Sequence, residues 1–173
     1  MRAFPLLSIL LIAGCAQAPS NAEYQKNLAT AKAVMQAHID MDYDAWLAYY
    51  ADDAVVWDAP YGTDKISAAD AAVLFATHHD AFDGISMSRE VWLPGVDTLN
   101  LQADGSVRAY INWAGTSKIN GKKLDLRAYH YWNFNGDGKI TQQGDFYDAG
   151  GVQAYVMGTS ESEVNLEEAT EVD

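Results

Sequence analysis

The chain has 173 residues, of which 24 are Asp or Glu and 11 are Lys or Arg, so its formal net charge at pH 7 is −13. Apolar residues make up 49% of it, as in a globular domain, and a chain of this length can bury a core without metals or disulfides to hold it together. The acidic balance repels phosphate backbones, so we expect no nucleic-acid partner. The single cysteine, Cys15, excludes an internal disulfide.

Residues 1–14 are predicted to be a signal peptide. Arg2 precedes an apolar run from Ala3 to Ala13, which at about 16 Å as a helix would span only half of a bilayer core. The end of this segment, Ile12-Ala13-Gly14-Cys15, resembles the bacterial lipobox. That resemblance implies a lipoprotein whose mature N-terminus is an acylated Cys15.

We therefore expect residues 15–21 to form a lipidated tether. Ala16 beside the cysteine favours the periplasmic face of the outer membrane, so the expected location is the bacterial cell envelope, with the membrane as a partner through the lipid anchor. An ordinary signal peptide with an incidental cysteine is the alternative.

Three amphipathic helices are predicted at the start of the folded domain, which is expected to span residues 22–158. The first ends near Asp40, Asp42 caps a short second helix that carries Trp46 inward, and Ser67 to Asp70 has the capping-box pattern of a third. The inward faces of the first and third helices are Tyr24, Leu28, Ala31, Met35, His38 and Ile39, and Ala71, Leu74, Phe75, His78 and Phe82.

After Gly84 the pattern changes to strands separated by turns. Pro94-Gly95, Asp104-Gly105, Asn120-Gly121 and Asp137-Gly138 punctuate strands predicted at 87–93, 98–103, 107–117, 123–134 and 139–147. Helices followed by hairpins predict an α+β domain in which about three N-terminal helices pack on one face of a curved antiparallel or mixed sheet. Residues 159–173 are expected to be an acidic, disordered tail.

Strand alternation indicates which residues face the helices. It places Val107, Ala109, Ile111 and Trp113 on the inner face of one strand and Leu126, Ala128, His130, Trp132 and Phe134 on the inner face of the next. His130 is thus the polar member of an apolar row. A hollow between a curved sheet and its helices, with one polar group projecting into it, is the usual form of a small-molecule site.

Three segments carry a family resemblance. Tyr50-Ala51-Asp52-Asp53-Ala54, the turn from Asp137 to Ile140, and Asp145-Phe146-Tyr147-Asp148-Ala149-Gly150 resemble the SnoaL-like group of the nuclear transport factor 2-like superfamily. The resemblance covers nearly all of residues 22–157. It implies a cone-shaped domain with a deep apolar pocket and a homodimer formed through the outer face of the sheet. Members include polyketide cyclases, ketosteroid isomerases, dehydratases and epoxide hydrolases.

The resemblance also implies roles for individual residues. Asp58, which lies two residues before Pro60, matches the general base of the ketosteroid-isomerase pattern with one residue inserted. His130 falls where that pattern has the acid that donates a hydrogen bond to the oxyanion, and a neutral histidine can also donate. Asp145 matches the acidic residue in the last strand of the cyclases and hydrolases.

Two departures limit the carry-over. The tyrosine that completes the oxyanion hole falls on Val34, which argues against steroid isomerisation. The Arg-x-Asp pair of the epoxide hydrolases falls on Trp113 and Gly115, which disfavours epoxide opening.

Each of the three candidate catalytic residues has a structural alternative. Asp58 can simply cap the turn before Pro60, and His130 can be a hydrogen-bonded core residue. Alternation from Ile140 and Phe146 places Asp145 outward unless the strand has a bulge, for which Gly144 is the candidate position.

The leading hypothesis is a pocket for a small apolar or aromatic ligand, with cofactor-free acid–base catalysis of the isomerase, cyclase or dehydratase type. Trp113, Trp132, Tyr61 and Tyr147 are the aromatic residues expected to surround the ligand. No metal is expected, because His78 and His79 are adjacent on a helix and their side chains diverge by about 100°. A non-catalytic ligand-binding or assembly lipoprotein is the alternative.

Overall fold

A computed structural model of the chain describes residues 20–158. The predicted signal peptide, Cys15 and the acidic tail lie outside the described residues. The elements are α1 (Ser20–Ile39), α2 (Tyr43–Leu47), β1 (Tyr50–Trp57), β2 (Ile66–Ser67), α3 (Ala68–Ala81), β3 (Phe82–Val96), β4 (Ala103–Ser117), β5 (Lys123–Phe134), β6 (Ile140–Phe146) and α4 (Ala149–Met157). This order confirms the predicted α+β class.

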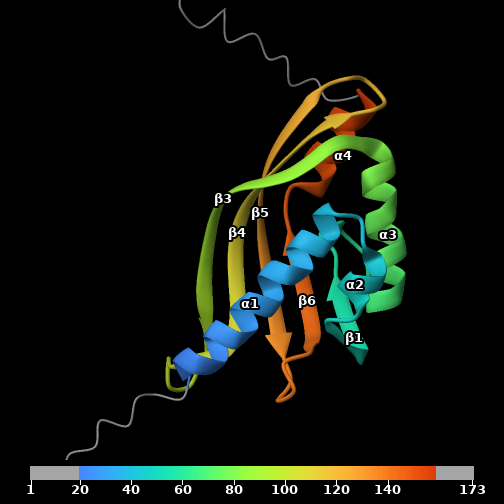
Figure 1. The fold of residues 1–173 in the computed structure, drawn as a ribbon. Coiled ribbons are helices and arrows are strands. Elements are labelled where there is room, and N and C mark those ends of the chain that lie inside the picture. Colours follow the sequence, from blue (N-terminus) through green and yellow to red (C-terminus); the bar gives the residue numbers. More distant parts are fainter. Residues whose placement is uncertain (1–19, 159–173) are drawn as a thin grey trace, which may run out of the picture.

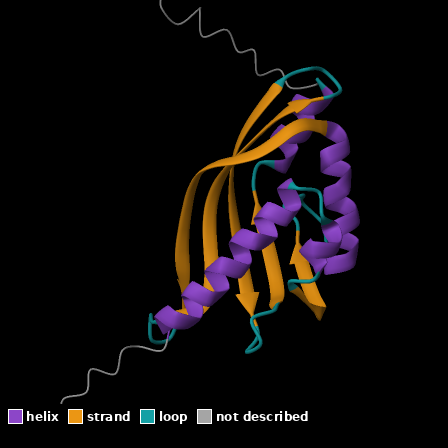
Figure 2. Ribbon diagram, viewed as in Figure 1, coloured by secondary structure: helices purple, strands orange, loops and turns teal. Residues whose placement is uncertain are grey.

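One mixed sheet of six strands forms the body of the domain. The strand order is β2-β1-β6-β5-β4-β3. β1 pairs with β6 in parallel, and the other neighbours are antiparallel. The sheet is bent, and α1 crosses its concave face while α2 and α3 lie beside β1 (Figures 1 and 2).

The helices begin where their capping residues predict. Asp42 accepts a hydrogen bond from the backbone N–H of Ala45 at 2.9 Å at the start of α2, and Ser67 accepts one from the N–H of Asp70 at 3.1 Å at the start of α3. Asp148 caps α4 in the same way. Each cap satisfies a backbone donor that the first turn of a helix leaves without a partner.

The predicted strand at 98–103 is wrong. β3 continues to Val96 through Pro94 and Gly95, where the sheet has an irregular register rather than a turn, and the turn to β4 follows at Asp97. The Asp97 side chain accepts hydrogen bonds from the backbone N–H groups of Leu99 and Asn100. The backbone N–H of Asp97 donates to the carbonyl of Gln102, and its carbonyl accepts from the N–H of Leu101, which closes the turn. Leu99 and Leu101 alternate as in a strand, but they are 94% and 72% exposed on this turn.

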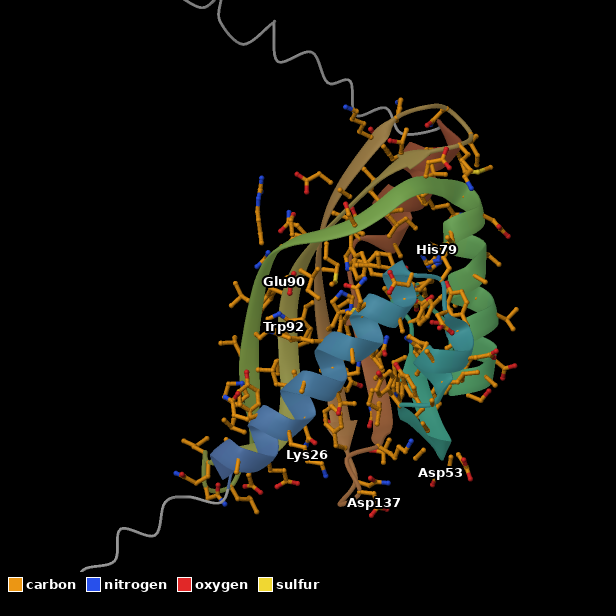
Figure 3. The ribbon with its side chains drawn as sticks, in the orientation of Figure 1. Lys26, Asp53, His79, Glu90, Trp92 and Asp137 are labelled. Atoms are coloured by element: carbon orange, nitrogen blue, oxygen red, sulfur yellow. The ribbon has the colours of Figure 1, made fainter. Side chains whose placement is uncertain are left out.

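The core lies between α1 and the concave face. The inner-facing residues in the middle of β4 and β5 are buried as strand alternation predicts, and α1 covers them with Ala31, Val34 and Met35. Three further inner-facing residues are half-buried: Trp113, Leu126 and Phe134. At one end, Lys26 of α1 lies beside the turn between β5 and β6 and donates to the backbone oxygen of Asp137 at 3.4 Å (Figure 3). No helix within residues 20–158 is long and apolar enough to cross a membrane.

A bulge in β6 settles the orientation of Asp145. Asn133 pairs with Gln142 and Phe134 with Ile140, so Thr141 is the extra residue on β6. Because of it, Ile140 and Asp145 both face inward although they are five positions apart. The bulge is therefore at Thr141 and not at Gly144 as the sequence suggested.

Gly144 has a different reason to be glycine. It lies opposite Tyr131 of β5 on the outer face of the sheet. A Cβ atom there would stand 1.9 Å from Cε1 of the Tyr131 ring, so only glycine lets the ring lie across the strand.

A candidate small-molecule site

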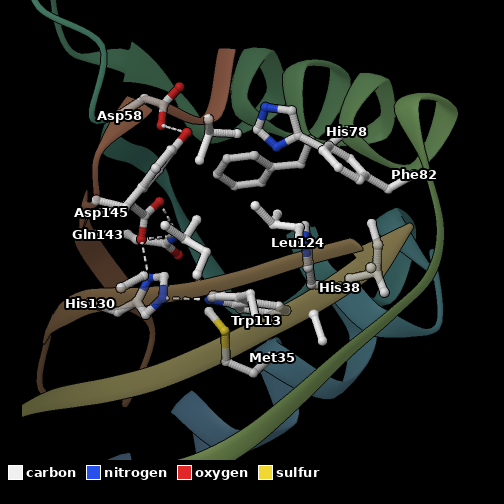
Figure 4. Close-up of a pocket in the computed structure, with 18 of the residues that line it drawn as sticks. Met35, His38, Asp58, His78, Phe82, Trp113, Leu124, His130, Gln143 and Asp145 are labelled. Carbon is white, nitrogen blue, oxygen red and sulfur yellow. Dashed lines mark hydrogen bonds and ion pairs between the residues drawn. The ribbon is translucent and has the colours of Figure 1, made fainter. Parts of the chain in front are cut away.

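A partly open cavity lies between the concave face of the sheet and helices α1, α3 and α4 (Figure 4). Its volume is about 140 Å³. The lining is mostly apolar and aromatic. Seven polar residues also line the cavity: His38, Asp58, His78, His130, Gln143, Asp145 and Tyr147.

Asp145 lies deepest among the acids and is 5% exposed. The amide nitrogen of Gln143 donates to its two carboxylate oxygens at 2.9 and 3.2 Å. The orientation of that amide is fixed, because the indole N–H of Trp132 donates to the Gln143 oxygen at 2.9 Å and the Tyr50 hydroxyl donates to the same oxygen. The amide nitrogen can therefore point only at Asp145.

A second indole fixes His130 in the same manner. The indole N–H of Trp113 donates to Nε2 of His130 at 2.9 Å, so Nε2 carries no proton. The ring proton is then on Nδ1, which lies 2.6 Å from Oδ1 of Asp145 and donates to it. His130 is thus a neutral imidazole in a defined tautomer. Both of its nitrogens are occupied within the protein.

Asp58 lies at the same end of the cavity as Asp145, because β1 pairs in parallel with β6. Trp57 of β1 pairs with Gly144 of β6. Because the two strands run parallel, the residues that follow them, Asp58 and Asp145, lie at the same end of the strand pair. Asp58 caps the turn through the backbone N–H of Ala59 at 2.8 Å, and it also lines the cavity. Burial raises its pKa, and the negative charge of Asp145 adds to that rise.

Tyr147 and Asp58 are hydrogen-bond partners on this wall. The Tyr147 hydroxyl lies 3.4 Å from Oδ1 of Asp58 and donates to it (Figure 4). Burial, together with the nearby charge of Asp58, raises the pKa of Tyr147. The hydroxyl therefore stays protonated at neutral pH.

Two histidines that were not predicted as site residues, His38 of α1 and His78 of α3, line the opposite wall. Burial lowers the pKa of His38 to about 3 and also lowers the pKa of His78. Both are therefore neutral at pH 7. The sequence held a signal for them, because each is the polar member of an inward helical row, as His130 is of its strand.

His79 points away from the cavity, as expected of a neighbour of His78 on a helix. It packs behind His38 with ring centroids 4.8 Å apart, and its Nδ1 lies 2.6 Å from the Tyr43 hydroxyl (Figure 3 marks its place on α3). No group of three metal-ligating side chains occurs among residues 20–158.

The structure brings together five of the seven predicted catalytic and ligand-binding residues: Asp58, Trp113, His130, Asp145 and Tyr147. Trp132 is fully buried beneath the cavity floor, where it orients Gln143. Tyr61 is fully exposed on the loop after β1 and does not line the cavity. The loop is not a strand, so strand alternation could not indicate where this side chain points. Val34 is a core residue of α1.

Comparison with known proteins gives a family and a set of similar folds. The family model described as "SnoaL-like domain" matches residues 31–143. No protein of curated function matches the sequence. A provisionally assigned isomerase from Bacillus subtilis is 18% identical, with a TM-score of 0.66 over 80% of this chain and 96% of that one.

Two further solved structures are similar to the chain. A provisionally assigned polyketide cyclase from Xanthomonas campestris is 19% identical, with a TM-score of 0.62 over 80% of this chain and 99% of that one. The pinacolase BvnE from Penicillium brevicompactum is 14% identical, with a TM-score of 0.61 over 77% of this chain and 93% of that one.

Proposed function

The chain belongs to the SnoaL-like domain family and has its cone-shaped, nuclear transport factor 2-like fold, and on that premise we propose that it is a cofactor-free acid–base catalyst acting on a small apolar or aromatic molecule. The reaction class is proton abstraction beside a carbonyl, as in isomerisation, cyclisation or dehydration. The observation that carries the proposal is the deep Asp145 carboxylate, which faces the cavity while fixed donors hold it.

The two carboxyl groups suit different roles. Asp145 lies deep in the cavity and fixed N–H donors hold both of its oxygens in place, so it is the proposed base. Asp58 has a pKa that burial raises, so it is the proposed carrier of the returning proton. Two carboxyl groups in different surroundings of one cavity can divide base and acid roles between them.

His130 is proposed to act through Asp145. Sequence comparison suggested His130 as the donor to a substrate oxyanion, and that role would require it to release one of its two present partners. A positioning role requires no such change. The N–H groups of His38 and His78, which line the opposite wall, are the proposed donors to the developing oxyanion.

Proton abstraction can be tested without knowing the natural substrate. Cyclohexanone, 2-tetralone and 6-hydroxy-2-tetralone, the last of which also carries a hydroxyl donor, are incubated with the protein in D₂O, and NMR follows exchange of the hydrogens beside the carbonyl. We expect the wild type to accelerate exchange, and Asp145→Asn to lose a factor of about 10² to 10⁴ of that acceleration. The matched control is Asp53→Asn, on the exposed part of β1. Equal rates for Asp145→Asn and wild type would refute the assignment.

A non-catalytic ligand-binding or assembly protein is the second candidate. Two observations favour it: Val34 supplies no hydroxyl, and both nitrogens of His130 are already bonded. Tight ligand binding without exchange of any ketone would support it over catalysis.

We also propose that Cys15 is lipidated and anchors the domain in the bacterial cell envelope, at the periplasmic face of the outer membrane. The support is the lipobox-like sequence before Cys15. Mass spectrometry of the membrane-extracted protein should find acyl chains on Cys15, and Cys15→Ser should release the protein into the soluble fraction.

A further inference from the structure

The cavity has no positive charge. None of the described residues that line it is Lys or Arg. The ion pair between described side chains that carry full charges is Lys118 with Asp83 at 3.6 Å, which lies outside the cavity, whereas the contact of His130 with Asp145 joins a neutral imidazole to a carboxylate. An anionic ligand would therefore find no side chain to neutralise it.

The histidines do not supply that charge either. His130 is neutral because the Trp113 indole occupies its unprotonated nitrogen. Burial keeps His38 and His78 neutral at pH 7, since it lowers the pKa of each. The ionisable groups that remain are Tyr147, which stays protonated, and the two acids Asp58 and Asp145, so the field inside the cavity is negative.

Hydrogen-bond acceptors outnumber donors at the acidic wall. Oδ2 of Asp145 accepts only the Gln143 amide, and the bonds to the Asp58 side chain both reach Oδ1. The Tyr147 hydroxyl already donates to Asp58. A ligand that donates a hydrogen bond completes this wall, whereas a ligand that only accepts leaves buried carboxylate oxygens without a partner.

The volume limits the size of the ligand. About 140 Å³ is close to the roughly 150 Å³ of an engineered apolar cavity that binds benzene. Because this cavity is partly open, a second fused ring also has room toward the mouth.

Resting on the proposed function, we infer that the substrate is a compact ring compound of one or two rings that carries no negative charge and whose hydroxyl or enol group donates to the acidic wall. Carboxylates, sulfonates and phosphates are rejected. The selectivity comes from repulsion by Asp58 and Asp145 and from the lack of any cation.

Four ligands built on naphthalene test this inference, because they differ only in the group at position 2. They are 2-naphthol, 2-methoxynaphthalene, 2-naphthoate and 2-naphthylmethylamine, which is a cation at pH 7. Titration calorimetry in 0.15 M salt gives the affinities, and NMR contacts to the methyl groups of Ala128 and Leu126, which line the cavity, locate the bound ring. We expect 2-naphthol to bind more tightly than 2-methoxynaphthalene, and 2-naphthoate to bind at least about tenfold more weakly than either 2-naphthol or the amine.

A variant that gains affinity for 2-naphthoate distinguishes the effect of the charges inside the cavity from the effect of the protein's net charge. The double variant Asp58→Asn/Asp145→Asn should bind 2-naphthoate at least about tenfold tighter than the wild type does. The control Asp52→Asn/Asp53→Asn removes the same charge from exposed positions of β1 and should change that affinity less than about twofold, because salt screens distant charges.

Three results would overturn the inference: 2-naphthoate binding as well as 2-naphthol, 2-methoxynaphthalene binding as well as 2-naphthol, or 2-naphthoate binding as well as the amine. Each would leave the proposed catalysis standing if Asp145→Asn still abolishes ketone exchange. If none of the four ligands enters the cavity, the ligand class is refuted. If the wild type also fails to accelerate ketone exchange, the proposed function is refuted.

Discussion

Gln143→Glu probes the buried network directly, because it replaces an N–H donor with an oxygen of nearly the same shape. The amide nitrogen lies 2.9 Å from an Asp145 oxygen. Two carboxylates at that distance would repel by about 6 kcal/mol even at an effective dielectric constant near 20. The new carboxyl group must therefore keep its proton in the folded state, where it can donate to Asp145 as the amide does.

The free-energy cost of binding that proton sets how far Gln143→Glu lowers the stability of the fold. In the unfolded chain the new group ionises with a pKa of about 4.3. Folding above that pH must take up a proton, which costs about 1.4 kcal/mol for each pH unit and about 4 kcal/mol at pH 7. The sign is fixed: the folded state holds a proton that the unfolded state lacks, so stability falls as pH rises. Below about pH 4.3 both states are protonated and the cost disappears.

Urea unfolding followed by tryptophan fluorescence from pH 4.5 to 8 measures this slope for wild type and Gln143→Glu. The matched control is Gln142→Glu, whose amide donates to the Tyr131 hydroxyl on the outer face and does not contact Asp145. We expect the difference in unfolding free energy between Gln143→Glu and wild type to grow with pH, and that of the control to stay flat. A pH-independent difference for Gln143→Glu would refute the contact between Gln143 and Asp145.

Three further predictions concern other parts of the domain. Gly144→Ala should lower stability by about 1–3 kcal/mol, because the added Cβ would stand 1.9 Å from the Tyr131 ring. Gly136 has open space around it, so the control Gly136→Ala should lower stability by less than about 1 kcal/mol. Thermal unfolding compares the two variants. For His38, the folded-state pKa of about 3 lies below the unfolded value, so the unfolded chain takes up a proton first and stability falls as pH drops below about 6.5. His38→Phe should reduce this acid loss by up to about 1.4 kcal/mol per pH unit in urea titrations, and an unchanged loss would show that His38 is not buried as described. The expected homodimer predicts that Phe146→Glu, at the exposed aromatic face of the sheet beside Tyr129, weakens self-association in sedimentation equilibrium, whereas Val73→Glu on α3 does not; a wild type that is monomeric at all concentrations would refute the dimer.

The sequence was sufficient for the parts of the fold that local chemistry determines. The caps at Asp42 and Ser67 and the inner rows of β4 and β5 follow from side-chain hydrogen bonding and period-two alternation. The turn before β4 was misplaced because Leu99 and Leu101 alternate like strand residues while Asp97 closes the turn around them. Periodicity cannot distinguish exposed alternating leucines from buried ones.

The candidate site was only partly predictable, for a reason that Asp145 illustrates. Simple alternation placed it outward, and one extra residue at Thr141, which no local pattern marks, turns it inward. The indole N–H groups that fix its donors come from Trp113 and Trp132 on two other strands, so their roles emerge only when the strands are paired.

The chemistry of the cavity follows from where the two indoles point. Each donates to the acceptor atom of a second side chain, and the donor nitrogen of that side chain is thereby directed at the same carboxylate. The donors are neutral, so they orient Asp145 without cancelling its charge. A cationic partner would have held the carboxylate as firmly but would have weakened it as a base and attracted anions into the cavity. Neutral positioning of a buried acid is therefore the feature that joins the proposed proton transfer to the proposed exclusion of anionic ligands.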